Sequence, residues 1–209
     1  MKAVLWDLDG TLVDTAADLA AAIDQMLADA SLAAIGEATV RRFIGHGARN
    51  LVDRCVREAG GEPGPDHLAG FLDRYRKGIC VRSRPYPGIA ALVRELGCQA
   101  VVTNKPEGLS RALLAALGLR IPVVVGGDTL AVRKPSPEPV RHALALLGVA
   151  TGVMIGDGEP DVQAAKSAGI RVIGVTWGIA TPTGADRLVG SVTELRTALT
   201  KESVTLGTA

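Results

Sequence analysis

Short apolar runs recur along the chain and stop at polar residues or glycine. The first run is Ala3–Trp6, and similar runs lie at 100–102, 121–125, 153–155 and 171–175. Their length and their β-branched residues are typical of strands rather than helices. We therefore interpret these five runs as buried strands.

Stretches with apolar residues at helical spacing separate the predicted strands. They cover 89–96, 106–117, 135–147 and 160–168, and a glycine follows each of them. Glycine is a common helix stop because it adopts the left-handed conformation freely. The alternation of strand and helix predicts an α/β fold, with a doubly wound parallel sheet covered by helices on both faces.

One long segment departs from this alternation. Residues 15–84 contain no convincing strand run, and helical stretches lie at 15–30, 38–44, 48–59 and 66–80. Thr15, with Asp18 three residues later, resembles a helix capping box. We predict an all-helical insertion over 15–84, a core made of 1–14 and 85–200, and a C-terminal tail over 201–209.

Length and composition exclude several classes of protein. A chain of 209 residues fits one core with a modest insertion. Because 23 Lys and Arg nearly balance 22 Asp and Glu, a nucleic-acid binder with a broad phosphate footprint is disfavoured. The three cysteines form no CxxC pair, so the sequence indicates neither a zinc site nor a disulfide framework. No apolar segment is long enough to span a membrane. We expect a cytoplasmic protein with no nucleic-acid or membrane partner, and leave a homodimer open.

Acidic residues follow the first predicted strand. Asp7 and Asp9 are two positions apart, so in an extended chain they share a face, and Gly10 permits a sharp turn. They lie where α/β sheets bind ligands, beyond the carboxyl end of a strand. A solvated acidic turn is the alternative. A calcium loop is disfavoured, because it needs a Glu at its twelfth position, where this sequence has Asp18.

Three further polar groups occupy comparable places. Thr103 and Asn104 follow the run at 100–102, and Lys134 precedes a predicted helix. Asp157 and Asp161 follow the run at 153–155. Taken singly, these residues also fit structural roles: an N-cap, a surface lysine, and acids at a helix N-terminus.

Taken together, the four groups suit one chemistry. Asp7 and Asp157 would repel each other at a shared sheet edge unless a cation lay between them. Mg²⁺ prefers a few carboxylates together with water and phosphate oxygens. Thr103 and Lys134 would then hold the other phosphate oxygens. The pattern therefore predicts a phosphoryl-transfer site that uses Mg²⁺.

The same groups resemble the motifs of a known family, the haloacid dehalogenase-like hydrolases. The four motifs correspond, in order, to residues 6–14, to Thr103-Asn104, to Lys134-Pro135, and to Gly156-Asp157 with Asp161. Within the family, residues 101–106 and 124–128 are most similar to the phosphoglycolate phosphatases. The resemblance implies a Rossmann-like core with a helical cap inserted after the first strand. It also implies that the partner is a small phosphorylated metabolite whose phosphate ester is hydrolysed, with 2-phosphoglycolate as the best guess.

The resemblance also implies roles for individual residues. Asp7 would attack phosphorus and form an aspartyl-phosphate, and Asp9 would act as general acid and then as general base. Lys134 would stabilise the charge on Asp7 and on the phosphoryl group. Thr103 and the Asn104 amide would bind phosphate oxygens.

The implied metal ligands are the carboxylates of Asp7 and Asp157 and the main-chain carbonyl of Asp9. Asp161 would orient these ligands and their waters. One departure from the family pattern is Gly158, which stands where Ser or Thr often follows the first acid of the fourth motif.

Substrate selectivity is expected from the insertion. The stretch Ile44–Arg49 combines two glycines with His46 and Arg49, and Arg49 could pair with a substrate carboxylate. A glycine-rich turn with a solvated arginine is the alternative. The core motifs also fit a sugar-phosphate mutase, a pyrophosphatase or a nucleotide phosphatase. A phosphate-binding regulatory module without turnover is disfavoured, because it needs neither Asp9 nor a cap.

Overall fold

The computed structural model describes residues 2–204 and contains a parallel sheet, as predicted, with six strands where the sequence predicted five. The strand order is β5-β4-β1-β6-β7-β8, so the chain crosses over in both directions from the first strand. The strands are β1 (Ala3–Trp6), β4 (Gln99–Val102), β5 (Val123–Val125), β6 (Gly152–Gly156), β7 (Arg171–Val175) and β8 (Arg187–Val189). This is the doubly wound arrangement that the alternation predicted and the Rossmann-like core that the resemblance implied, and β1 lies inside the sheet between β4 and β6.

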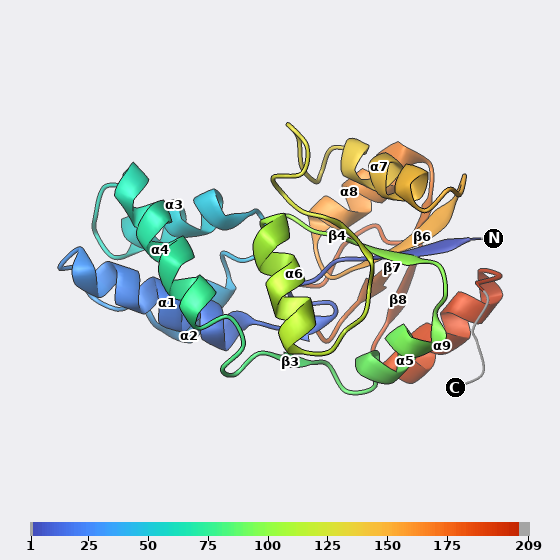
Figure 1. Cartoon of the computed structure of the whole chain (residues 1–209), viewed down its shortest axis with the longest axis horizontal. Helices are drawn as coiled ribbons and strands as arrows, with labels where there is room; N and C mark the ends of the chain where they lie inside the picture. The colour runs from blue at the N-terminus through green and yellow to red at the C-terminus, as the bar shows by residue number, and fades with distance from the viewer. Residues whose placement is uncertain (1, 205–209) are drawn as a thin grey trace.

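Helices cover both faces of the sheet (Figure 1). One face packs against α5 (Ile89–Glu95), α6 (Glu107–Ala116) and α9 (Val192–Lys201), and the other against α7 (Glu138–Leu146) and α8 (Glu159–Ala168). Successive residues of β1 point to opposite faces: Val4 and Trp6 join the first cluster, and Ala3 and Leu5 the second. Helices therefore shield both faces of the sheet from water, which explains why most residues of the strands are apolar.

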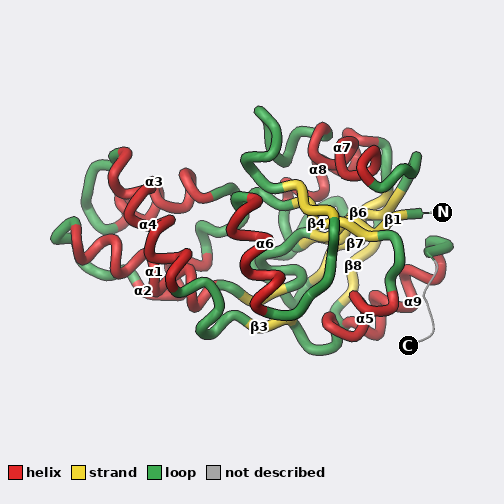
Figure 2. Tube along the Cα trace, viewed as in Figure 1, coloured by secondary structure: helices red, strands yellow, loops and turns green. Residues whose placement is uncertain are grey.

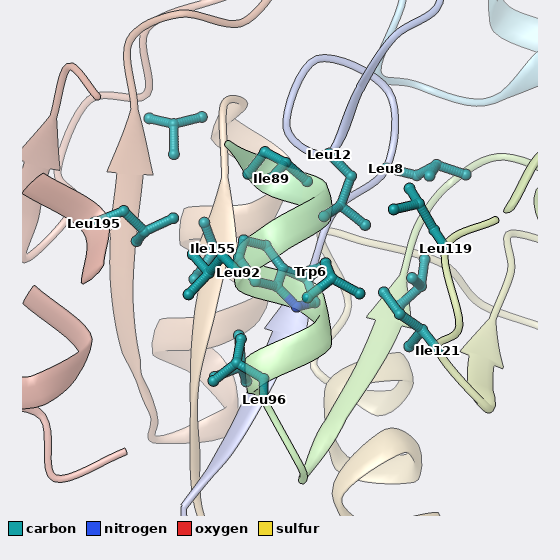
Figure 3. Packing of buried hydrophobic residues seen from close by; sticks show 14 of the residues in the cluster. Trp6, Leu8, Leu12, Ile89, Leu92, Leu96, Leu119, Ile121, Ile155 and Leu195 are labelled. Carbon is teal, nitrogen blue, oxygen red and sulfur yellow. The ribbon is translucent and has the colours of Figure 1, made fainter. Parts of the chain in front are cut away.

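Trp6 is fully buried at the centre of one of these clusters (Figure 3). Leu92 and Leu96 of the α5 region lie beside its ring. The indole N–H of Trp6 donates to Gln99 Oε1 over 3.0 Å, and Gln99 Nε2 donates to the carbonyls of Val93 and Leu96. The buried polar atoms of this pair are thus satisfied, as a dry core requires.

The insertion is all-helical between its two ends and has its own apolar cluster (Figure 2). Its helices are α1 (Ala16–Asp29), α2 (Gly36–Arg41), α3 (Ala48–Glu58) and α4 (Pro65–Lys77). Ile23, Val52 and Phe71 are buried among them. Leu109, on α6 of the core, belongs to the same cluster, so the cap packs directly against the core.

Two strands at the ends of the insertion escaped prediction. β2 (Val13–Asp14) and β3 (Arg84–Pro85) pair antiparallel where the chain leaves and re-enters the core. Two residues are too few to show a period, so the sequence carries no signal for such strands.

The predicted capping box is wrong. The Thr15 side chain makes no cap hydrogen bond; its Oγ1 donates to Asp9 Oδ1 over 2.7 Å. The Asp18 carboxylate accepts hydrogen bonds from the backbone N–H groups of Arg82 and Ser83 and from the Ser83 hydroxyl. The partner of Thr15 lies six positions earlier and those of Asp18 lie 64 and 65 positions later, so neither side chain makes the capping bond that the spacing suggested.

The C-terminal end of the core is longer than predicted. β8 was not among the predicted strands, α9 includes Lys201, and Val204 is buried against the core cluster. Residues 205–209 of the predicted tail lie outside the described residues. Within residues 2–204, no helix combines the length and the apolar character that crossing a membrane requires.

Candidate active site

The predicted site residues gather at the carboxyl ends of three neighbouring strands. Asp7 follows β1, Thr103 follows β4 and Asp157 follows β6. The backbone N–H of Asp7 donates to Ile155 O over 2.8 Å, and that of Thr103 to Val125 O over 3.0 Å. These bonds extend the parallel ladder by one residue, so each side chain starts from a fixed backbone position.

Lys134 lies at the centre of the group. Its Nζ is 2.9 Å from Asp7 Oδ1, 2.6 Å from Asp161 Oδ1 and 2.6 Å from Val102 O. All three ammonium hydrogens therefore have acceptors. Burial alone would lower the pKa of Lys134, but the carboxylates of Asp161 and Asp7 outweigh it and raise the pKa. The lysine is charged at neutral pH and is aimed at the predicted nucleophile.

Three buried carboxylates surround this lysine. Asp7, Asp157 and Asp161 can each place an oxygen within 4.8 Å of the others. Burial and the charge of Asp7 raise the pKa of both Asp157, to about 6, and Asp161, to about 7. When ionised, three carboxylates against one ammonium leave an excess of negative charge. This excess, together with the all-oxygen donor set, fits a divalent cation such as Mg²⁺.

The two acids after β6 are held differently. Asp157 accepts from Thr11 Oγ1 at 3.0 Å and from the backbone N–H of Ile179 at 2.8 Å. Asp161 uses one oxygen for Lys134 and the other for the backbone N–H of Gly158, at 3.1 Å. Asp161 is thus placed to orient Lys134 and the loop that follows β6. The lack of a side-chain hydroxyl at Gly158 does not disturb this arrangement, because the backbone N–H of Gly158 donates the hydrogen bond to Asp161.

Gly10 forms one wall of the acidic cluster. Its φ is +88°, and a Cβ at this position would lie 2.3 Å from Asp157 Oδ2. The turn after Asp9 therefore requires glycine both for its backbone angle and for the approach of Asp157. Beyond it, Trp177 Nε1 donates to Thr11 O over 3.2 Å, which connects the loop after β7 to the turn after β1.

Asp9 is held by a lysine that the sequence analysis did not assign. Lys105 Nζ lies 2.9 Å and 3.1 Å from the two carboxylate oxygens of Asp9, and Thr15 donates to the same carboxylate. Lys105 is buried, and its Nζ lies 4.4 Å from the centre of the Tyr75 ring on α4 of the cap. A lysine between Asn104 and Pro106 gave no sign of burial, because the contact with Tyr75 exists only after the cap folds over.

Thr103 and Asn104 take distinct places. Thr103 Oγ1 accepts the backbone N–H of Lys105 at 3.2 Å, which leaves its own hydrogen for a ligand. Asn104 Nδ2 donates to Gly45 O and to Lys134 O, both at 3.0 Å. The Asn104 side chain therefore connects the cap loop that contains Gly45 to the core loop that contains Lys134. Within residues 2–204, the buried Asn104 Oδ1 has no hydrogen-bond partner.

Two pockets meet at Asp7 and Asp9. The first lies under the cap; Thr103, Asn104 and Lys105 form its polar side, and its walls are mostly apolar. The apolar walls are Leu19, Ile44, Leu51, Phe71, Tyr75, Pro106 and Leu109. The second pocket is lined by Lys134 and the two acids after β6.

The two cap residues predicted to contact substrate differ in position. His46 lines the second pocket, beside the acidic cluster. Arg49 is exposed in the first turn of α3, and the residues that line the two pockets do not include it. A contact between Arg49 and substrate stays a prediction.

Known proteins match this chain in sequence and in fold. A model of the haloacid dehalogenase-like hydrolase family matches residues 1–169. A phosphoglycolate phosphatase of Cupriavidus necator is 44% identical, over 95% of this chain and 93% of that protein. A phosphoglycolate phosphatase of Rhodospirillum rubrum is 43% identical, over 85% and 80%. The crystal structure of a predicted phosphoglycolate phosphatase from Haemophilus somnus has a TM-score of 0.86 and 30% identity, covering 95% of this chain and 97% of that one. The matches span both the sheet and the helical insertion.

Proposed function

Because the chain belongs to the haloacid dehalogenase-like hydrolase family, we propose that it is a Mg²⁺-dependent phosphatase that hydrolyses 2-phosphoglycolate. The observation that carries this proposal is the ammonium of Lys134 between Asp7 and Asp161, at a pocket that Asp9 also lines. The activity named for the relatives supports the choice of substrate. We place the reaction in the cytoplasm, and a homodimer stays a prediction.

In the first step, an Asp7 carboxylate oxygen attacks phosphorus in line with the leaving oxygen. The new O–P bond forms an aspartyl-phosphate as the bond from phosphorus to the alcohol oxygen breaks. Asp9 gives its proton to that oxygen, which leaves as the alcohol. Lys134 offsets the negative charge beside Asp7, while the Thr103 hydroxyl and the Asn104 backbone N–H hold phosphoryl oxygens.

In the second step, water attacks the phosphorus of the aspartyl-phosphate opposite its bond to Asp7, on the side that the alcohol has left. Asp9, now a carboxylate, takes the proton of that water, and the bond from phosphorus to Asp7 breaks. Inorganic phosphate leaves, Asp7 returns to its carboxylate form, and Asp9 is protonated again. One residue thus acts as acid and then as base, which explains why the site needs a second carboxylate that is not the nucleophile.

The acidic residues of the site suit the binding of Mg²⁺ in this mechanism. The carboxylates of Asp7 and Asp157 and the main-chain carbonyl of Asp9 would hold Mg²⁺, and Asp161 would orient the group. When bound, Mg²⁺ supplies positive charge that lets an anionic carboxylate approach an anionic phosphate.

Replacement of Asp7 by asparagine tests the covalent step. Asp7→Asn keeps the shape but removes the nucleophilic oxygen, so we expect Mg²⁺-dependent phosphate release from 2-phosphoglycolate to fall by more than about 10³-fold. Thermal unfolding of the variant provides the control, because the substitution also relieves repulsion in the acidic cluster and should not lower the melting temperature. Retention of more than a few per cent of wild-type activity would contradict the mechanism.

A panel of sugar phosphates, nucleotides and pyrophosphate tests the choice of substrate. Hydrolysis of one of these compounds in preference to 2-phosphoglycolate would favour another activity of this fold.

A further inference from the structure

We propose that Lys105 is a specificity residue that binds a carboxylate on the leaving alcohol of the substrate. This inference rests on the proposed phosphatase function and deepens it, because it assigns the substrate class to a feature of this chain. The substrate would be a phosphate monoester with a carboxylate attached directly to the ester carbon.

The first argument is the charge inside the pocket. Among the lining residues that the structure describes, Lys105 carries the only positive charge of the pocket under the cap. Its side chain is 4% exposed, so its ammonium is shielded from bulk water. An anion that enters this pocket beside the phosphate therefore has one positively charged partner among these residues. The apolar walls, such as Leu51 and Phe71, favour a short substrate with no further polar groups.

The second argument is reach. Lys105 Nζ is 2.9 Å from Asp9 Oδ1, and the proposed mechanism puts the leaving oxygen one hydrogen bond from the Asp9 carboxyl. The ammonium and the leaving oxygen are then separated by at most about 6 Å, the sum of two hydrogen-bond lengths. A carboxylate two bonds away from the leaving oxygen falls within this span. The site as it stands can therefore bridge phosphate and carboxylate.

The third argument is an unused donor at the same place. The Tyr75 side chain is 1% exposed and lines the pocket, and its hydroxyl has no hydrogen-bond partner within the described residues. Burial raises the pKa of Tyr75 to about 12, so the hydroxyl remains a donor at neutral pH. A substrate carboxylate next to Lys105 would satisfy this donor, and Tyr75 would bring the cap into contact with the anion. Arg49, by contrast, is exposed and outside the pocket.

The test compares matched substrates. 2-Phosphoglycolate and ethyl phosphate have the same heavy-atom chain from phosphorus to the second carbon and differ in the carboxylate. Phospholactate and isopropyl phosphate form a second such pair, and an aryl phosphate needs little help from a general acid. We would measure kcat/KM on all five for wild type, Lys105→Met, Lys105→Arg and Arg49→Met, with Mg²⁺ present.

Loss of the Lys105 charge should affect the acids more than their alkyl isosteres. Lys105→Met also removes the ion pair that holds Asp9, but both members of a substrate pair share this loss, so it cancels in their ratio. We expect Lys105→Met to lower the ratio of kcat/KM for the preferred carboxylated ester to that for its isostere by about 10- to 150-fold, the size of a charge-assisted hydrogen bond, with most of this change in KM. The aryl phosphate, which needs little help from the general acid, should change least. Lys105→Arg keeps the charge and should keep the preference for the acid. If Lys105→Met fails to fold, the ratio of acid to isostere in Lys105→Arg still reports the preference.

Four results would overturn the inference. Equal losses on acids and alkyl isosteres, with the aryl phosphate spared, would mean that Lys105 only positions Asp9. Equal losses on all five substrates would make Lys105 structural. Loss of the preference in Arg49→Met, with Lys105→Met unchanged, would assign the contact to Arg49. The fourth result is a wild-type enzyme that prefers neither acid over its isostere. By contrast, a wild-type preference for phospholactate over 2-phosphoglycolate would contradict the proposed function alone, and the Lys105 comparison would proceed on that pair.

Discussion

At the scale of single residues, Gly10 is the position where the backbone and the acidic cluster constrain each other most. A side chain there must adopt an unfavourable φ and also displace the Asp157 carboxylate. We expect Gly10→Ala to fold with a lowered melting temperature and to need a higher Mg²⁺ concentration for half-maximal activity. The backbone alone should cost roughly 1–2 kcal/mol.

Gly118→Ala is the matched control for this prediction. Gly118 also has a positive φ, +67°, but an added Cβ would meet no atom within 4 Å. Both variants carry backbone strain, and only Gly10→Ala adds the contact with Asp157. An equal effect of the two substitutions on Mg²⁺ dependence would show that Gly10 does not shape the acidic cluster.

At the scale of elements, Asp18 joins the first cap helix to the segment that returns to the core. Burial would raise the pKa of Asp18, but hydrogen bonds from the side chain and backbone of Ser83 and the backbone of Arg82 outweigh it and lower the pKa. A lowered native pKa means that the carboxylate stabilises the fold above the ordinary value of 3.8, and that this contribution is lost as pH falls through the native pKa.

Removal of this carboxylate should loosen the base of the cap. Asp18→Ala leaves the buried donors of Ser83 and the partly buried N–H of Arg82 unpaired, so we expect the free energy of unfolding to fall by roughly 1–3 kcal/mol near neutral pH. The difference from wild type should shrink at acid pH, where the wild-type carboxylate is protonated. Denaturant unfolding measures both, with Asp73→Ala as the control, because among residues 2–204 Asp73 pairs only with Lys77, in an exposed ion pair. A constant difference down to low pH would contradict this account.

How far the sequence predicts the elements depends on their length and on where their partners lie. Helices such as Glu159–Ala168 have several apolar positions and a glycine stop, so they were found to within a few residues. β5 begins at Val123 instead of 121, because Pro122 has no N–H to add to the ladder. The edge strand β8 is three residues long and begins with Arg187, and so short a segment shows no hydrophobic pattern. The acids after the strands were found because strand ends are local features, whereas Lys105 depends on a contact with Tyr75, 30 positions earlier.

At the scale of the whole molecule, the acidic cluster predicts how Mg²⁺ and pH act on stability. Burial and the charge of Asp7 raise the pKa of Asp157 to about 6, above the ordinary value of 3.8. Between these values the native state binds more protons than the unfolded chain, so the metal-free protein loses stability as pH rises through this window. Protons and Mg²⁺ compete for the same oxygens.

The stabilisation by Mg²⁺ should therefore grow as pH rises. We expect a small increase in melting temperature on addition of Mg²⁺ near pH 5 and a larger one near about pH 7.5, where the carboxylates are ionised. Thermal scans in Mg²⁺ and in chelator at several pH values measure this. Asp157→Asn is the comparison: it removes one charge, so its metal-free form should be more stable at neutral pH and gain less from Mg²⁺. A shift that does not depend on pH would contradict the assignment of the metal to these acids.

The two tryptophans of this chain stand in very different surroundings. Trp6 is sealed inside the sheet with its indole bonded to Gln99, far from solvent. Trp177 is bonded to Thr11, whose hydroxyl holds Asp157, so its ring lies next to the loop that would tighten around a cation. Intrinsic fluorescence therefore contains two separable signals, one that reports loss of the core and one that reports events at the acidic cluster. Cation binding at the acidic cluster and unfolding of the core can therefore be measured on the unlabelled protein.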